Sequence, residues 1–200
     1  AGNLFFNVID SLDWDPFVAV YSSVPWNPSA DIWYHVELVR DGSDYYFFID
    51  GTQLGDAQTE AASLPDLTGP AYIGAFGLST PGKFMNGWID ELKITKEEPP
   101  PVVDPDARLY IPADGRDTSQ NFMDAAGRHA VTVAGDAQID TAEKKEGTGS
   151  ALFDPFDGSG DYLSLADSED WNFGAEDFTI DFWVRFNGSV PDNVTFFSQV

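Results

Sequence analysis

The 200-residue sequence predicts an all-β protein built as an antiparallel β-sandwich. Aromatic residues make up 14% of the chain, and aromatic side chains favour the half-buried surface of a strand. The chain also contains 18 Gly and 13 Pro, which interrupt helices and suit turns. We find no long stretch whose apolar residues recur at helical spacing. Many short strands separated by turns therefore account best for this composition.

Residues 1–97 contain a clear predicted hairpin. The segment 33–40 alternates in polarity, with Tyr34, Val36 and Leu38 on one face. Asp41-Gly42 is a hairpin turn signal, and Asp50-Gly51 is a second one after the returning strand. Further strands in this part are predicted at 4–8, 17–21, 45–49, 72–74 and 88–94.

A proline-rich segment at 98–106 is the candidate linker of the chain. Consecutive prolines do not donate to a β-ladder and favour an extended polyproline conformation. Nine residues in that conformation span about 28 Å. The linker divides the chain into residues 1–97 and 107–200.

Residues 107–200 contain the strongest strand of the sequence, at 178–186. Its odd positions and even positions separate cleanly, with Phe178, Ile180 and Phe182 on an apolar face and Thr179 and Asp181 on the other. Such alternation predicts a strand with one face in the core. Weaker strands are predicted at 108–111, 131–133, 137–139, 151–153 and 162–165.

The charge of the chain excludes some partners. The chain contains 10 Lys and Arg and 34 Asp and Glu, which gives a formal net charge of −24. A chain this acidic repels phosphate backbones and anionic membrane surfaces, so we expect neither nucleic-acid binding nor membrane insertion. No apolar run is long enough to span a bilayer. The absence of cysteine excludes disulfides, thiol catalysis and zinc sites built on cysteine.

Both halves resemble the laminin-G-like (concanavalin A-like lectin/glucanase) jelly-roll family. Residues 1–97 carry motifs similar to the C-terminal part of that family, and residues 107–200 carry motifs similar to its N-terminal part. The first set is Trp33-Tyr34-His35-Val36, Phe48-Ile49-Asp50-Gly51, Tyr72-Ile73-Gly74 and residues 84–94. The second set is residues 124–129, Gly149-Ser150-Ala151-Leu152-Phe153, Gly160-Asp161-Tyr162-Leu163 and residues 177–185.

The order of the two halves is inverted relative to this family. Neither half can bury its sheet alone, because each would leave an apolar face and open edges. The chain is then a circular permutant that closes on itself, a window cut from a tandem array, or a unit that completes a sandwich with neighbouring copies in a fibre. The proline-rich linker favours the tandem and fibre arrangements, because a permutant needs a shorter connection. The opening Ala1-Gly2-Asn3 suggests a processed piece of a longer protein.

The sequence predicts no active site. Glycoside hydrolysis needs two carboxylates on either side of one bond. Asp90 and Glu91 are adjacent, so on a regular strand they point to opposite faces, and Asp181 is the one acid on its face of its strand. The two histidines, His35 and His129, are interpreted as structural residues, and neither accompanies a serine nucleophile. A glycoside hydrolase is the distant alternative.

Calcium is the cofactor that we expect, in a structural role. Calcium binds six to eight oxygen ligands, and the loop 154–161 is acidic and rich in glycine. The resemblance implies an ion between this loop and the Gly-x-Ile-Asp-Glu segment, with Asp157 or Asp161 and Asp90 as its ligands. An ordinary turn with solvated carboxylates is the alternative interpretation.

For a ligand surface, the candidates are Trp14, Trp26 and Trp171, which occur in stretches rich in predicted loops. An exposed ring of this kind can stack on a sugar, although aromatic residues in β proteins are more often in the core.

The resemblance implies a non-catalytic extracellular, cell-surface or virion module for adhesion. Its expected partners are a glycan or surface protein and neighbouring copies of itself. The alternative is a structural fibre, filament or decoration subunit that assembles by half-domain complementation.

Overall fold

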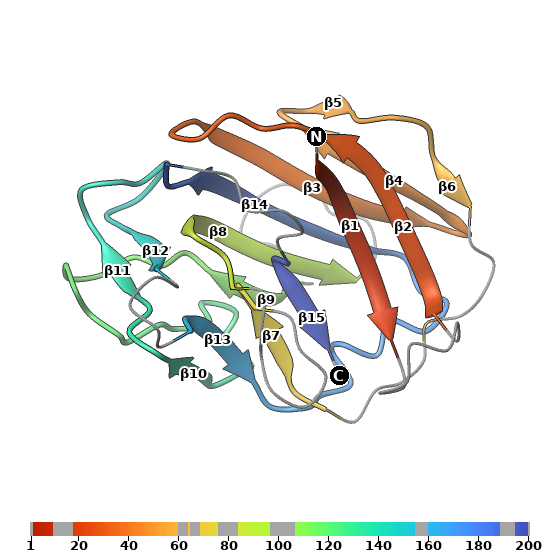
Figure 1. The fold of residues 1–200 in the computed structure, drawn as a ribbon. Coiled ribbons are helices and arrows are strands. Elements are labelled where there is room, and N and C mark those ends of the chain that lie inside the picture. The colour runs from red at the N-terminus through yellow and green to blue at the C-terminus, as the bar shows by residue number, and fades with distance from the viewer. Residues whose placement is uncertain are drawn as a thin grey trace.

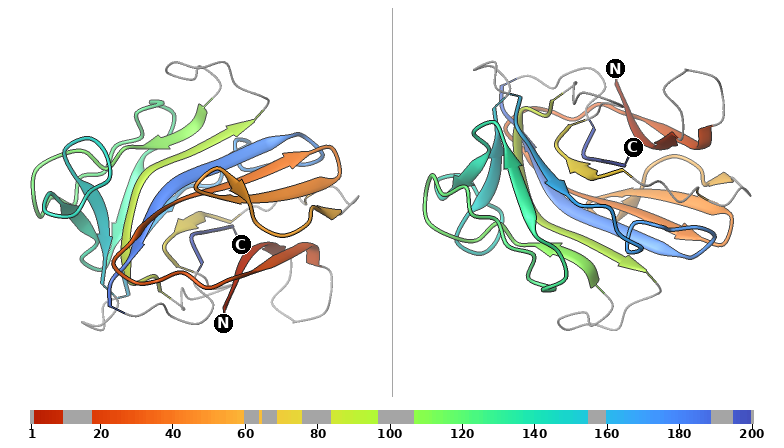
Figure 2. Two further views of the ribbon diagram at one scale, coloured as in Figure 1. Left: turned by 90° about the horizontal axis from the view of Figure 1, so that it is seen from above. Right: turned by 90° about the horizontal axis from the view of Figure 1, so that it is seen from below.

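The structure is a computed structural model, and it describes residues 2–9, 18–59, 64, 69–75, 84–96, 107–154, 160–188 and 195–199. The described residues form strands and turns and contain no helix. All strand pairs are antiparallel, and the sheets pack face to face. Figures 1 and 2 show the two layers. The predicted antiparallel β-sandwich is therefore confirmed.

The larger sheet has nine strands, and β14 lies at its centre between β8 and β3. In spatial order its main path is β11 (Gln138–Asp140), β12 (Ser150–Phe153), β8 (Gly87–Lys96), β14 (Phe178–Phe186), β3 (Trp33–Asp41), β4 (Asp44–Ile49) and β5 (Thr52–Gln53). Off this path, β9 (Ala107–Ile111) pairs with β8, and β6 (Gln58–Thr59) pairs with β4.

The opposite layer consists of shorter strands. Its four-stranded sheet runs in the order β10 (Val131–Ala134), β13 (Tyr162–Leu165), β7 (Ala71–Ile73) and β15 (Phe197–Gln199). The pair β1 (Gly2–Ile9) and β2 (Val18–Trp26) continues this layer, because β1 contacts β15. In Figure 1 these strands lie in front of the larger sheet.

The core lies between the two layers. Strand β14 buries every second residue, as its alternation predicts, so that Phe178, Ile180 and Phe182 face inward. Ile73 and Leu163 of the opposite layer belong to the same buried cluster. This leaves the other face of β14, with Thr179, Asp181, Trp183 and Arg185, on the outside of the larger sheet.

The two halves of the sequence complete each other within one chain. Strand β7, from the first half, lies between β13 and β15 from the second. Strand β14, from the second half, lies between β8 and β3 from the first. Among the described residues the missing partner strands come from the same chain, which is the arrangement of a circular permutant. The preference for neighbouring copies stays a prediction.

The linker also connects neighbours in space. Strand β8 ends at Lys96 and β9 begins at Ala107, and Thr95 is the register partner of Ala107. Residues 97–106 lie outside the described residues. The linker is longer than this connection requires, yet the residues on either side of it belong to adjacent strands of one sheet.

This interleaving predicts that the halves associate without a covalent link. Residues 1–96 and 107–200, produced as two chains in one cell, are expected to copurify as a one-to-one complex, because β7 and β14 lack sheet partners otherwise. A tag on the first piece and the mass of the purified species test this. Two pieces that fold separately and do not associate would contradict the prediction.

Candidate ligand-binding site

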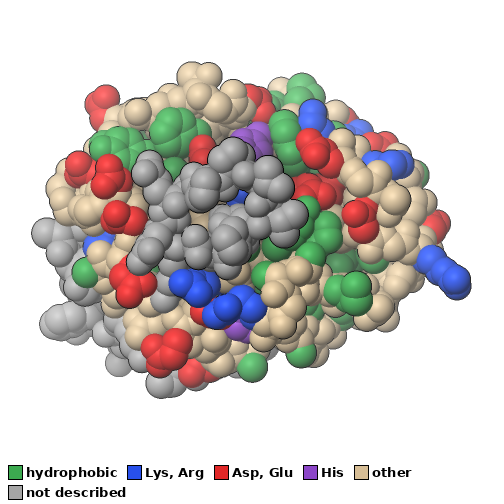
Figure 3. All heavy atoms as spheres, turned by 180° about the vertical axis from the view of Figure 1, so that it is seen from behind, with side chains coloured by type: hydrophobic (Ala, Val, Ile, Leu, Met, Phe, Trp, Pro, Cys, Tyr) green, Lys and Arg blue, Asp and Glu red, His purple; other side chains and the backbone are tan. Residues whose placement is uncertain are grey.

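One row of side chains crosses the outer face of the larger sheet. It consists of Phe48, Glu37, Asp181, Lys93 and Tyr110, which are successive register partners on β4, β3, β14, β8 and β9. All five residues are partly exposed. Since neighbouring strands lie about 4.8 Å apart, this outer row spans about 19 Å. Figure 3 shows the molecule from the side of this face, where acidic side chains outnumber basic ones.

Asp181 is the central carboxylate of the outer row. Its Oδ2 lies 3.4 Å from Lys93 Nζ and 3.8 Å from His35 Nε2. Its Oδ1 is buried and has no hydrogen-bond partner among the described residues. The Asp181 carboxylate raises the pKa of His35. Burial, with a further contribution from the charge of Asp181, raises the pKa of Glu37.

A β-bulge adds two more carboxylates to this face. The register of β8 against β14 shifts between Asp181 and Trp183, and Glu91 has a φ of 55°, unusual for a residue with a side chain. Asp90 is the register partner of Trp183, whose ring is on the outer face, and the Glu91 carboxylate accepts a hydrogen bond from the Tyr110 hydroxyl. Asp90 and Glu91 therefore share the outer face.

These neighbours correct the argument that set catalysis aside. The expectation that Asp90 and Glu91 point to opposite faces was wrong, because the bulge interrupts the alternation of β8. Asp181 is not isolated either, since Glu37 is directly opposite it on β3. Burial raises the pKa of Glu91.

Asp90 holds a loop against the sheet. Its side chain is fully buried, and its Oδ2 accepts hydrogen bonds from the N–H groups of Lys145 (2.9 Å) and Glu146 (3.0 Å). Its Oδ1 has no partner among the described residues. Burial raises the pKa of Asp90 to about 6.

The same loop covers one end of the outer face. Lys145 Nζ lies 4.1 Å from the centre of the Trp183 ring, and the His35 ring lies 5.0 Å from it on the neighbouring strand. Arg185 pairs with Asp31 and with Glu143 of the loop, both at 3.3 Å.

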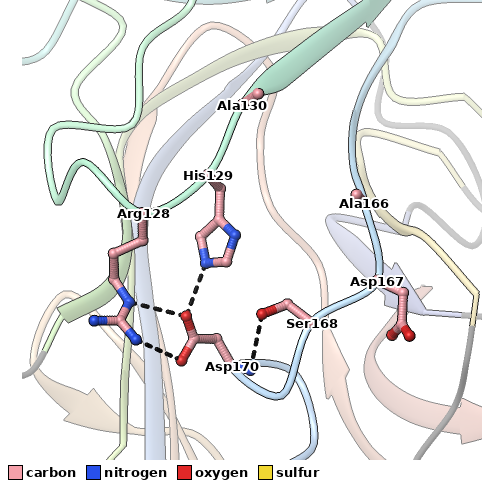
Figure 4. Close-up of a pocket in the computed structure, with 7 residues that line it drawn as sticks. All are labelled: Arg128, His129, Ala130, Ala166, Asp167, Ser168 and Asp170. Atoms are coloured by element: carbon pink, nitrogen blue, oxygen red, sulfur yellow. Dashed lines mark hydrogen bonds and ion pairs between the residues drawn. The ribbon is translucent and has the colours of Figure 1, made fainter.

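A separate pocket of about 550 Å³ opens at the rim of the sandwich (Figure 4). Arg128 and His129 both point to Asp170, at 2.9 Å, while Asp167 points away from them. Burial acts to raise the pKa of Asp170, but the hydrogen bonds and charges of Arg128 and His129 together lower it. Because these polar groups satisfy one another, we regard the pocket as a structural junction.

Asp124 fixes the loop that forms this pocket. Its Oδ1 accepts the N–H groups of Tyr110 and Ala126, both at 2.9 Å. Its Oδ2 accepts those of Arg128, at 2.9 Å, and His129, at 3.0 Å. One buried carboxylate therefore connects the pocket to the strand that carries Tyr110 of the outer row.

The predicted calcium ligands hold separate backbone segments. Asp161 accepts the N–H groups of Asp136 (2.9 Å) and Asp154 (2.8 Å), whereas Asp90 binds residues 145–146. Asp157 lies outside the described residues. Within the described ranges, no group of three or more His, Asp or Glu side chains is arranged to hold a metal ion. Calcium stays a prediction.

The predicted tryptophans occupy different environments. Trp171 is 1% exposed, its ring lies 4.4 Å from the His129 ring and its indole N–H donates to the Ala166 carbonyl at 3.0 Å, which differs from the exposed ring that sugar stacking needs. Trp26 is partly exposed and meets the edge of Tyr34 at 5.5 Å. Trp14 lies outside the described residues.

Sequence reasoning missed the outer row because its members come from five separate segments. The alternation of 33–40 and 178–186 already placed Glu37 and Asp181 on the polar faces of their strands. The order of the strands, which makes them neighbours, was not in the sequence pattern.

Comparison with known proteins gives one match. The model of the family described as the Concanavalin A-like lectin/glucanases superfamily matches residues 1–99. No curated protein and no solved structure matches the chain. The described residues include no helix capable of crossing a bilayer.

Proposed function

Residues 1–99 belong to the concanavalin A-like lectin/glucanase superfamily, and from this premise we propose that the chain is a non-catalytic recognition module that binds glycans through the outer row. Its proposed localisation is extracellular, on a cell surface or on a virion. Its expected role is adhesion to a glycan or to a glycan-bearing surface protein.

The chemistry of the outer row carries the proposal. Phe48 and Tyr110 place partly exposed rings at its two ends, and an aromatic ring packs well against the apolar face of a sugar. Glu37, Asp181 and Lys93 lie between them and offer charged acceptors and donors for hydroxyl groups. A row about 19 Å long, at the usual strand spacing, suits a chain of several sugars.

Replacing Phe48 tests the proposal. Phe48→Ala is expected to weaken binding of a glycan found on a microarray by about fivefold, because an aromatic contact contributes about 1 kcal/mol. Tyr72→Ala is the control, since Tyr72 is a partly exposed aromatic residue in the other layer, against Tyr162. Failure to bind any glycan, or equal losses in both variants, would contradict the proposal.

A glycoside hydrolase is the second candidate, and the proximity of Glu37 and Asp181 favours it. Carboxylates on paired residues of adjacent strands come close enough for acid–base chemistry. The proposal of a non-catalytic module expects no release of reducing sugars from any polysaccharide panel. Release that Glu37→Gln abolishes would make the chain an enzyme.

Self-assembly by exchange of halves is the structural alternative. The pairing of β14 with β8 and β3 joins the two halves, and the same register can form between copies. The proposed recognition module is expected to be a compact monomer in solution. A mass corresponding to large assemblies would favour the fibre subunit.

A further inference from the structure

The sequence contains two Asn-Gly pairs, Asn86-Gly87 and Asn187-Gly188. Asparagine before glycine is prone to lose its side-chain amide, because the glycine nitrogen can reach the asparagine Cγ with no side chain in its way. The reaction needs an asparagine side chain that can turn and a glycine nitrogen that is not held in a hydrogen bond. The fold places the two pairs in opposite environments.

The pair Asn187-Gly188 meets both needs. Asn187 is the first residue after β14, and its side chain is exposed. No hydrogen bond between described residues engages the Asn187 side-chain amide or the Gly188 N–H. Gly188 has a φ of 70°, and nothing lies within 4 Å of the position that a Cβ would occupy there. The Gly188 nitrogen and the Asn187 Cγ are therefore free to approach each other.

The pair Asn86-Gly87 meets neither need. Asn86 is 2% exposed, and its Nδ2 donates a hydrogen bond to the Asn187 carbonyl at 2.9 Å. Gly87 begins β8 opposite Phe186 of β14, and a Cβ at Gly87 would lie 2.1 Å from the Arg185 carbonyl oxygen. Turning the Asn86 side chain toward the Gly87 nitrogen would break its hydrogen bond in a space that the backbone of β14 already fills. Asn86 can react only when the two strands open.

We propose that Asn187 is a site of spontaneous modification, which converts to aspartate and isoaspartate in the folded protein while Asn86 is preserved. The Gly188 nitrogen forms a bond to Asn187 Cγ and gives up its proton. The bond from Cγ to Nδ2 breaks, and Nδ2 leaves with that proton as ammonia. Water then opens the resulting succinimide ring at one of its two carbonyl carbons, which gives aspartate or isoaspartate. No electron is transferred, and glycan binding plays no part in the step.

The products change the end of the central strand of the larger sheet. Either product adds one negative charge next to β14, in a chain that already carries −24. In isoaspartate the backbone runs through the former side chain, and the former main-chain carbonyl of Asn187 becomes a carboxylate. That carbonyl is the acceptor of the Asn86 amide, so the modified residue offers Asn86 a charged acceptor in place of a neutral one.

Peptide mass mapping of the whole chain, kept folded at mildly alkaline pH, tests the proposal. The peptide that contains Asn187 is expected to gain about 1 Da and to separate into two products of equal mass. Fragmentation assigns the gain to Asn187 rather than to Asn193 of the same peptide. Asn187 is expected to convert at least about tenfold faster than Asn86, because the reaction at Asn86 waits for the strands to open. In urea that unfolds the chain, both are expected to convert at similar rates, because glycine follows each.

Two variants locate the reaction. Asn187→Gln keeps an amide but would have to close a larger ring, so the mass gain is expected to be lost from this peptide. The exposed Asn121, which precedes Phe122, provides the control, and Asn121→Gln is expected to keep the gain at Asn187. Equal conversion of Asn86 and Asn187 in the folded chain would overturn the proposal. An Asn187 that stays intact in the folded chain, over the time in which it converts in urea, would overturn it too.

Discussion

Asp124→Ala is expected to destabilise the protein by about 3–5 kcal/mol, because one buried carboxylate accepts four backbone N–H groups. Each hydrogen bond contributes about 1 kcal/mol. The N–H groups that lose their acceptor stay partly desolvated in the loop, and this adds to the loss of stability. Tyr110 also loses the contact that fixes its backbone to the pocket loop. We therefore expect glycan binding to fall together with stability.

Urea denaturation measures this effect, with two variants for comparison. Asp124→Asn keeps the oxygen for one pair of N–H groups and is expected to cost about half as much. Asp167→Ala, an exposed position in the same pocket, is expected to change the free energy of unfolding by about 0.5 kcal/mol or less. A loss below about 1 kcal/mol for Asp124→Ala would show that the N–H groups find other acceptors.

The second large effect is a dependence of stability on pH that comes from Asp90. Burial raises the pKa of Asp90 from 3.8 to about 6 in the folded protein, so the folded state holds this proton more tightly than the unfolded state. Raising the pH from about 4 to about 6 therefore favours unfolding, and Asp90 costs about 3 kcal/mol above that window. Below pH 3.8 the cost disappears.

The difference between the wild type and Asp90→Asn isolates this contribution. The free energy of unfolding of Asp90→Asn, minus that of the wild type, is expected to rise by about 3 kcal/mol between about pH 4 and pH 7. For Asp90→Ala, the same difference in free energy of unfolding is expected to rise equally with pH, but from a lower value at about pH 4. This variant also releases the N–H groups of residues 145–146. Parallel curves for the wild type and the variants would contradict the prediction. A cation bound at Asp90 Oδ1 would contradict it as well.

Local patterns were sufficient to predict most of the strands. The alternation over 178–186 coincides with β14, and the segment 33–40 lies within β3, which ends at Asp41. Asp50-Gly51 forms the turn between β4 and β5, with positive φ at both residues. The first hairpin differs slightly, because Asp41 pairs with Asp44 and the two-residue turn is Gly42-Ser43. Side-chain period and turn chemistry act over a few residues, so they can be read from the sequence.

The outer row could not be predicted in the same way. Glu37 and Asp181 are 144 positions apart, and their contact depends on β14 lying next to β3. The bulge at Glu91 has no glycine or proline to announce it, so regular alternation gave the wrong face for one of two adjacent acids. These features depend on tertiary pairing, which a period of two residues does not encode.

The order of the halves limits how early this protein can fold during synthesis. Strand β14 is the centre of the larger sheet, yet residues 178–186 leave the ribosome after β3 and β8, between which they belong. Until then β3 and β8 each expose an unpaired edge, which is a template for aggregation. The pairings of β14 with β3 and β8, of β12 with β8 and of β13 with β7 also join residues far apart in sequence, and such topologies fold slowly. We therefore expect slow refolding after dilution from denaturant, and chaperone binding by nascent chains that stop before residue 178.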